Sequence, residues 1–163
     1  MDITLIIAGG VLIGCMIGLS WFAGSDAPYV PTKMDKIREV LKSAGIKKGK
    51  KFYELGSGDG RVVFEAAKLG AHPIGIEQSL LRVLYSRYKK VKNAKFIHGN
   101  IFSKTYSDAD IIYIYLLPKG VAKLEEKLKK ELNKGSIVIT QTYHFKTWKP
   151  FKKEGDFWLY LKA

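Results

Sequence analysis

The sequence of 163 residues is poor in the residues that build disulfides and metal sites. Its single cysteine, Cys15, excludes an internal disulfide and any multi-cysteine metal centre. The three histidines, His72, His98 and His144, lie far apart without ligand spacing, so we expect no metal. Neither internal repeats nor low-complexity segments occur. Hydrophobic residues at 47% and charged residues at 26% are typical of a globular domain and argue against disorder.

Acidic residues are also scarce. Fifteen Asp and Glu stand against 28 Lys and Arg, which leaves a net charge of +13 at pH 7. Such a surplus suits either nucleic acid or the surface of an anionic membrane. A nucleic-acid interface would need basic residues interleaved with exposed aromatics on one face, whereas the lysines cluster at expected element ends, in 47–51 and 89–92. We therefore favour a membrane surface and place nucleic acid second.

One stretch carries no charge at all. Residues 3–23 are almost wholly apolar, and 21 residues suffice to cross a hydrocarbon core of about 30 Å. A cleaved signal peptide is the main alternative, but it would have a basic start and a shorter apolar run. Trp21 and Phe22 end the run, where aromatic rings favour the headgroup zone. The sequence therefore predicts a transmembrane anchor over residues 1–23.

The distribution of charge predicts how this anchor is oriented. All basic residues lie after residue 23, and positively charged segments stay in the cytoplasm. We expect a single-pass membrane protein with its N-terminus outside and the following domain in the cytoplasm. Within the anchor, Gly10, Gly14 and Gly18 recur every four residues, and such a stripe allows close helix contact and predicts a homodimer. The alternative is that glycine is simply common in membrane helices.

The most informative motif follows an apolar strand at 51–55. It is a glycine-rich turn, then a helix, then a second strand ending in Glu77, the arrangement of a nucleotide-binding βαβ unit. Glycine reaches the positive φ that a tight turn needs and lets a ligand lie against bare backbone. Glu77 stands where an acid accepts hydrogen bonds from ribose hydroxyls. The residues expected to bind the cofactor here are Glu54, Gly56, Ser57, Gly58, Asp59, Gly60 and Glu77.

The charges around the turn distinguish between ligands. Acidic residues flank it at Glu54 and Asp59. Carboxylates repel a pyrophosphate but attract a sulfonium and an ammonium. The pattern therefore favours S-adenosylmethionine over a dinucleotide. A purely structural turn in a flavodoxin-like domain is the alternative.

Strands alternate with helices along the rest of the chain, which predicts a parallel sheet covered on both faces. A closing pair of strands adds an antiparallel edge. The predicted fold is a Rossmann-like, seven-stranded, mostly parallel α/β methyltransferase domain at 46–163, after a linker and cofactor-covering segment at 24–45. The expected helices are 33–44, 61–69, 79–91 and 119–132, and the expected strands are 51–55, 72–77, 94–98, 109–116, 136–143, 148–150 and 157–161.

Two further segments should meet the glycine turn at the carboxyl edge of this sheet. After the third strand, Asn100 and Ile101 stand where methyltransferases often place an acid that binds the adenine amino group. The Asn100 side-chain oxygen can accept that bond, and an ordinary turn residue is the alternative. After the fourth strand, Tyr115 and Pro118 lie where amino-methylating enzymes hold the methyl group and the incoming nitrogen, although a proline here is also a common strand stop.

Together these motifs resemble a known family. In order along the chain they are Tyr29-Val30-Pro31-Thr32, Glu54 to Arg61, Gly75-Ile76-Glu77, Tyr115-Leu116-Leu117-Pro118 and Trp148-Lys149-Pro150. This order is similar to that of the small membrane-anchored lysine methyltransferases that act on the ATP synthase c subunit and the adenine nucleotide translocase, and of their prokaryotic relatives. The resemblance covers nearly the whole chain. It implies that Tyr29 and Thr32 fold over the cofactor and that the acceptor is a lysine of a membrane or membrane-associated protein.

Methyl transfer to an amine makes few demands on a protein. The site must align a neutral nitrogen with the methyl group and exclude water, and an apolar channel lowers the pKa of a lysine. Tyr29, Tyr115 and Trp148 are candidates for the channel walls, and Tyr115 and Pro118 are the expected catalytic residues. No general base is required. The alternatives are a methyltransferase for a small molecule, a quinone or RNA, and a binding module without turnover.

Overall fold

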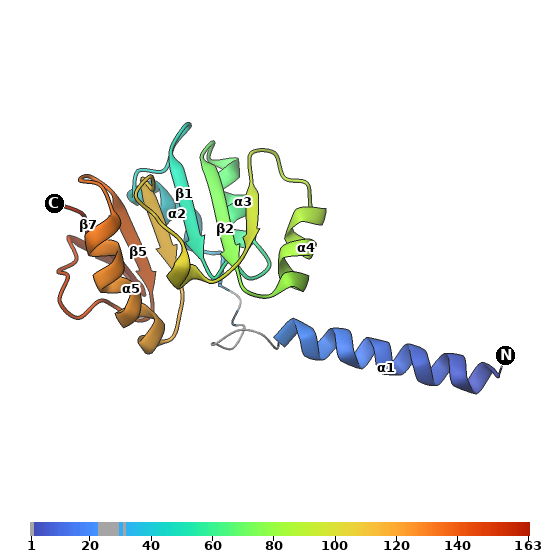
Figure 1. The fold of residues 1–163 in the computed structure, drawn as a ribbon. Coiled ribbons are helices and arrows are strands. Elements are labelled where there is room, and N and C mark those ends of the chain that lie inside the picture. The colour runs from blue at the N-terminus through green and yellow to red at the C-terminus, as the bar shows by residue number, and fades with distance from the viewer. Residues whose placement is uncertain (1, 23–29, 31) are drawn as a thin grey trace.

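The computed structural model describes residues 2–22, 30 and 32–163, in which helices alternate with strands as the sequence predicts (Figure 1). The elements are α1 (Ile3–Phe22), α2 (Ile37–Ser43), β1 (Lys51–Leu55), α3 (Arg61–Lys68), β2 (His72–Glu77), α4 (Leu80–Tyr88), β3 (Lys95–His98), a short 3-10 helix (Ile101–Ser103), β4 (Ile111–Ile114), α5 (Pro118–Glu131), β5 (Ile137–Gln141), β6 (Lys152–Glu154) and β7 (Phe157–Leu161).

The strands form one seven-stranded sheet in the order β3-β2-β1-β4-β5-β7-β6. The first five run parallel, β7 pairs antiparallel with β5, and β6 pairs antiparallel with β7. The predicted Rossmann-like, mostly parallel sheet is therefore confirmed. Because the chain leaves β1 toward β2 and later returns to β4 on its other side, the loops after these strands diverge and leave a crevice at their carboxyl ends.

Two hydrophobic cores cover the two faces of the sheet. Successive side chains of a strand point to opposite faces, so Phe52 joins the core beneath α2 and α3, whereas Tyr53 joins the core beneath α5. Figure 1 shows α5 in front of the sheet, with α2 and α3 behind it. A smaller cluster joins Val63 of α3, Val83 of α4 and Phe96 of β3. Helices α2, α3, α4 and α5 thus each pack through one apolar face, as the sequence periodicity predicts.

The final pair of strands begins later than the sequence suggests. The expected strand at 148–150 is wrong, since β6 occupies Lys152–Glu154. The reason is a polar contact: the backbone N–H of Trp148 donates to the Glu125 carboxylate of α5 over 2.6 Å, which draws this stretch onto the helix. Pro150 therefore lies in no strand, and β6, which follows it, is the last strand of the sheet.

Helix α1 leads away from the sheet in Figure 1 and contacts α4. Its large apolar side chains between Ile3 and Leu19 are exposed by 53–71%. Within residues 2–22, 30 and 32–163, no helix meets the length and apolarity of a membrane span. The transmembrane anchor expected over residues 1–23 is thus not confirmed.

Candidate active site

A cavity of about 890 Å³ opens at the carboxyl ends of the parallel strands. It is lined by the loops after β1, β2, β3, β4 and β5 and by the chain before α2. The lining residues predicted from the sequence are Thr32, Glu54, Gly56, Ser57, Gly58, Asp59, Glu77, Ile101, Tyr115 and Pro118. The fold therefore brings most of the predicted site residues to one place.

The glycine turn after β1 has the geometry that its sequence predicts. Gly56, Gly58 and Gly60 have φ values of +85°, +54° and +82°, which side chains other than that of glycine rarely allow. The N–H groups of Gly56 and Ser57 donate to the Ile76 carbonyl at 2.9 and 3.0 Å. The turn is thus tied to the end of β2.

Glu77 closes the other side of the turn. One carboxylate oxygen accepts from the Gly58 N–H at 2.8 Å, and the other accepts from the Ser79 N–H at 2.9 Å. Arg82 of α4 forms a buried ion pair with Glu77, with 3.4 Å between Nη1 and Oε1. A carboxylate has about four lone-pair positions, so Glu77 can still accept from a ribose hydroxyl while it fixes the loop. The structure thus shows Glu77 fixing the loop, and its binding of a ribose stays a prediction.

Glu54 places a buried carboxyl at the floor of the cavity. Burial raises its pKa well above the usual range, and the nearby carboxylates of Asp59 and Glu77 raise it further. The Val63 N–H, which donates to Glu54 at 3.1 Å, and the Arg61 guanidinium oppose this shift. Such a group is stabilised in its ionised form by a bound cation.

Ser57 supplies an unsatisfied hydroxyl beside these acids. The residue is 3% exposed and lines the cavity, and none of the described residues hydrogen-bonds its Oγ. Buried polar groups normally have partners. A ligand in the cavity can therefore provide one. The buried carboxyl of Glu54, the acid of Glu77 and this hydroxyl together suit the ammonium, sulfonium and ribose of S-adenosylmethionine.

The N-terminal segment is fastened across the glycine turn. Arg61 pairs with Asp59, with 2.6 Å between Nη2 and Oδ2, and also donates to the Thr32 carbonyl at 3.2 Å. The Thr32 hydroxyl lies 3.5 Å from the hydroxyl of Tyr113, which in turn donates to Gln141. Thr32 is therefore held at the wall of the cavity, and the covering of a cofactor by this segment stays a prediction.

The other half of the cavity is mostly uncharged. Tyr115, half-buried against the first core, and Pro118, the first residue of α5, lie here with Leu116. Thr142, at a φ of +65°, and Tyr143 complete this half from the end of β5. This arrangement suits an apolar approach for an acceptor group.

Several predicted residues lie elsewhere. Tyr29 falls outside the described residues. Gly60 does not line the cavity; a Cβ there would lie 2.6 Å from the Phe96 ring, so this glycine permits close packing. Asn100 is likewise not among the described lining residues, and its side chain accepts from the Phe102 N–H at 2.8 Å, as in an ordinary turn. Trp148 stacks on Phe145 in the second core and is no cavity wall.

The cavity residues that sequence reasoning missed include Arg61, Arg82, Thr142 and Tyr143. Arg61 directly follows the glycine motif, and its charge beside Asp59 was a usable signal. The other three depend on how α4 and the end of β5 fold back toward β1, which no local pattern encodes.

Comparisons with known proteins agree with this geometry. The model of the ANTKMT methyltransferase domain matches residues 54–152. The chain belongs to this family. It is also 32% identical over 130 residues to the protein-lysine N-methyltransferase of Saccharolobus islandicus, covering 76% of this chain and 81% of that protein.

A human relative, named as a lysine N-methyltransferase of the ATP synthase c subunit, is 33% identical over 134 residues, or 79% of this chain. The chain spans 57% of that protein's length. Among solved structures, an RNA methyltransferase from Salinibacter ruber bound to S-adenosyl-L-homocysteine superposes with a TM-score of 0.77 at 30% identity. That superposition covers 82% of this chain and 94% of the other. The family, the fold and the cofactor class thus agree with the site.

Proposed function

We propose that this protein transfers a methyl group from S-adenosylmethionine to the side-chain amine of a protein lysine. The observation that carries the proposal is the two-sided cavity, in which an acid-lined glycine turn meets an aromatic and mostly uncharged half. The relatives named as protein-lysine N-methyltransferases support the same acceptor.

Each half of the cavity has its own task. When bound, S-adenosylmethionine supplies an electrophilic methyl group on a sulfonium. Glu77 and the glycine turn bind its ribose, and Ser57 and the ionised Glu54 bind its polar and cationic parts. Thr32, fastened by Arg61, covers the site and excludes water. These residues position the ligand and do not exchange protons with the acceptor.

The half of the cavity around Tyr115 and Pro118 would prepare the acceptor. A protonated lysine has no lone pair, so the incoming amine must be neutral. Tyr115, Leu116 and Pro118 surround it with apolar groups, and the exposed Lys119 and Lys123 at the cavity add positive charge. Both effects lower the pKa of an entering lysine. Tyr115 and Pro118 would align the nitrogen with the methyl group that bound S-adenosylmethionine supplies, and the amine would give up its proton to solvent, so no general base is needed.

We further propose that residues 1–23 anchor the protein in a membrane, with the N-terminus outside and the domain at 46–163 in the cytoplasm. The first and last turns of α1 carry no charged residue, and its apolar side chains are exposed. Beside a membrane, the acceptor lysine would belong to a membrane or membrane-associated protein. Tethering raises the effective concentration of such a partner without any new contact.

RNA is the second candidate acceptor, because the Salinibacter ruber structure is named an RNA methyltransferase. To decide, membranes and RNA from cells lacking this protein are incubated with the purified protein and S-adenosylmethionine carrying a labelled methyl group. We expect label on a lysine of a membrane protein, located by mass spectrometry. Label confined to RNA or to the lipid extract would overturn the lysine proposal.

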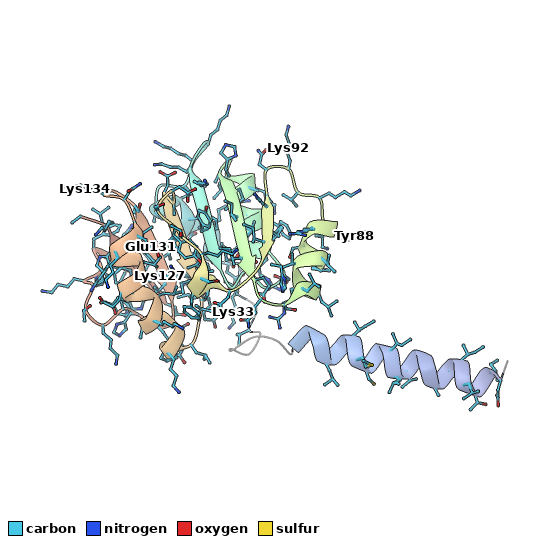
Figure 2. All side chains as sticks on the ribbon, in the orientation of Figure 1. Lys33, Tyr88, Lys92, Lys127, Glu131 and Lys134 are labelled. Carbon is cyan, nitrogen blue, oxygen red and sulfur yellow. The ribbon has the colours of Figure 1, made fainter. Side chains whose placement is uncertain are left out.

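The cofactor site has its own test by calorimetry. Glu77→Ala should weaken binding by about 1.5–3 kcal/mol, because the carboxylate that accepts hydrogen bonds from the ribose is removed. Gly58→Val should abolish binding, since valine cannot adopt the φ of +54° without moving the turn. Lys134→Gln, far from the cavity on the surface, is the matched control (Figure 2). Unchanged affinity in both site variants, with their folds intact, would contradict the assignment.

A further inference from the structure

Helix α4 has an outer face that the fold leaves uncovered. Leu80, Leu84 and Tyr88 follow one another at four-residue spacing, and they are 50%, 50% and 80% exposed. Tyr85 lies beside them at 39%. The opposite face of the same helix is buried in the domain through Arg82, Val83 and Ser86. Three large side chains of this face, Leu80, Leu84 and Tyr88, are therefore at least half exposed.

The chain around this face carries charge of a single sign. Residues 78–107 contain five lysines and two arginines and no aspartate or glutamate. Arg82 and Arg87 are engaged inside the domain, with Glu77 and with the Phe96 carbonyl. Lys89, Lys90 and Lys92, which follow α4, are exposed. Lys89 lies 4.8 Å above the Tyr85 ring, which joins the basic cluster to the apolar face.

We propose that this α4 face, formed by Leu80, Leu84, Tyr85 and Tyr88 with Lys89, Lys90 and Lys92, docks on the surface of an anionic lipid bilayer. A helix with apolar and aromatic residues on one side and lysines at its border binds in the headgroup region. Each lysine near such a surface contributes about 1 kcal/mol. The absence of acidic residues over 78–107 removes the repulsion that the lipid phosphates would otherwise meet.

The position of the face agrees with this partner. Figure 1 shows α4 on the side of the domain toward which α1 extends, and the two helices are in contact. In Figure 2, Tyr88 lies on this side of the domain and Lys92 lies above it, at the upper end of the loop that follows α4, whereas Lys134 lies at the opposite end of the domain. A bilayer that receives the apolar side chains of α1 would thus lie against the outer face of α4.

Docking would also orient the cavity. The inner face of α4 carries Arg82, which pairs with Glu77 in the cofactor site. The helix N-terminus follows directly on Gln78, which lines the cavity. A lipid surface against α4 therefore holds the cavity at a set distance from the headgroups. The proposal concerns where the domain sits, so it holds for any acceptor at that depth.

The test uses the full chain with Cys15→Ser, so that one new cysteine can carry an environment-sensitive fluorophore. Leu84→Cys reports on the α4 face, and Lys134→Cys is the matched control. We expect a blue shift of the Leu84→Cys label with vesicles of phosphatidylcholine and phosphatidylserine, reversed by high salt. Vesicles of phosphatidylcholine alone should give a much smaller shift. The Lys134→Cys label should not respond to either.

Replacing Lys89, Lys90 and Lys92 by glutamate should weaken the binding of the α4 face to the anionic vesicles, measured from the shift as a function of lipid concentration. Each lysine contributes about 1 kcal/mol, so the affinity should fall at least about a hundredfold. Flotation of the same samples on phosphatidylcholine vesicles separately reports insertion through α1. Protein that floats with both vesicles while the Leu84→Cys label stays unshifted would overturn the docking proposal and leave the anchor intact. An equal shift of both labels would also overturn it, because binding would then not be specific to α4.

Discussion

Glu54 and Glu125 are both buried carboxyls, and their surroundings shift their pKa values in opposite directions. Around Glu54, burial raises the pKa, and two neighbouring carboxylates add to it. Burial also acts against ionisation of Glu125, but N–H donors from Lys146, Thr147 and Trp148 outweigh it and hold the pKa below its usual range. Ionised Glu54 thus requires a cation from a bound ligand, whereas the hydrogen bonds within the fold already stabilise ionised Glu125.

Glu54→Gln should stabilise the ligand-free protein by ~0.5–2 kcal/mol near neutral pH. Between the ordinary and the raised pKa, the folded state retains a proton that the unfolded chain has lost, so the stability of the wild type falls as pH rises. Glutamine does not titrate, so the variant avoids this loss of stability, and its side-chain oxygen can still accept the hydrogen bond from the Val63 N–H. Denaturant unfolding as a function of pH measures the effect. A destabilised variant, or a gain that persists unchanged at low pH, would contradict it.

Glu125→Gln should do the reverse and cost ~1–3 kcal/mol at neutral pH. Because the pKa of Glu125 is lowered in the folded protein, its carboxylate stabilises the fold at pH values above the ordinary glutamate pKa. This contribution is lost as the pH falls through the pKa that Glu125 has in the folded state. The variant and the wild type should therefore converge in acid. The same unfolding series tests this, and a difference that grows toward low pH would refute the assigned sign.

Cofactor affinity should fall as the pH is lowered through the raised pKa of Glu54. Below it, binding a cation must first release the Glu54 proton. Titration calorimetry in buffers of different ionisation enthalpy should detect that released proton, and Glu54→Gln should lack it. Equal proton release from both proteins would place the titrating group elsewhere.

At the scale of elements, the contact between β2 and the glycine turn shapes the cofactor site. A Cβ on Gly75 would lie 2.7 Å from the Ser57 Oγ and 2.9 Å from the Phe96 ring. Gly75→Ala should therefore cost ~1–3 kcal/mol by overpacking and should weaken cofactor binding. Adding Ser57→Gly should recover part of the stability but not the affinity. Additive losses in the double-mutant cycle would rule out this contact as the cause.

The strands also show where a local sequence pattern no longer predicts the secondary structure. The predicted bounds 51–55 and 72–77 match β1 and β2 residue for residue, because the glycine turn marks the end of the first strand and Glu77 marks the end of the second. The tryptophan at 148 has the β propensity of a strand residue, yet Glu125 of a distant helix captures its N–H. A long-range hydrogen bond of this kind outweighs propensity.

At the scale of the whole molecule, the glycine stripe of α1 makes a prediction that stands apart from the catalytic site. A Cβ on Gly10, Gly14 or Gly18 would meet no atom within 4 Å, so this face is open within the chain. If two copies associate there, Gly14→Leu should reduce cross-linking through Cys15 in membranes. Equal monomer fractions for the two proteins would mean that these glycines serve no interface.

The sequence by itself determined the glycine turn, the acid that closes it, the order of strands and helices and the uncharged N-terminal run, because each depends on neighbouring residues and a local period. Only the tertiary structure decided which charges meet. Arg82 reaches Glu77 from α4, Arg61 joins Asp59 to Thr32, and Thr142 and Tyr143 arrive from β5 to complete the cavity. The same holds for the exposed face of α4, since the packing of its inner side alone decides which of its apolar residues remain outside. Even where the partners lie close in sequence, as Arg82 and Glu77 do, the energies of these contacts depend on distance and burial, which a linear pattern does not contain.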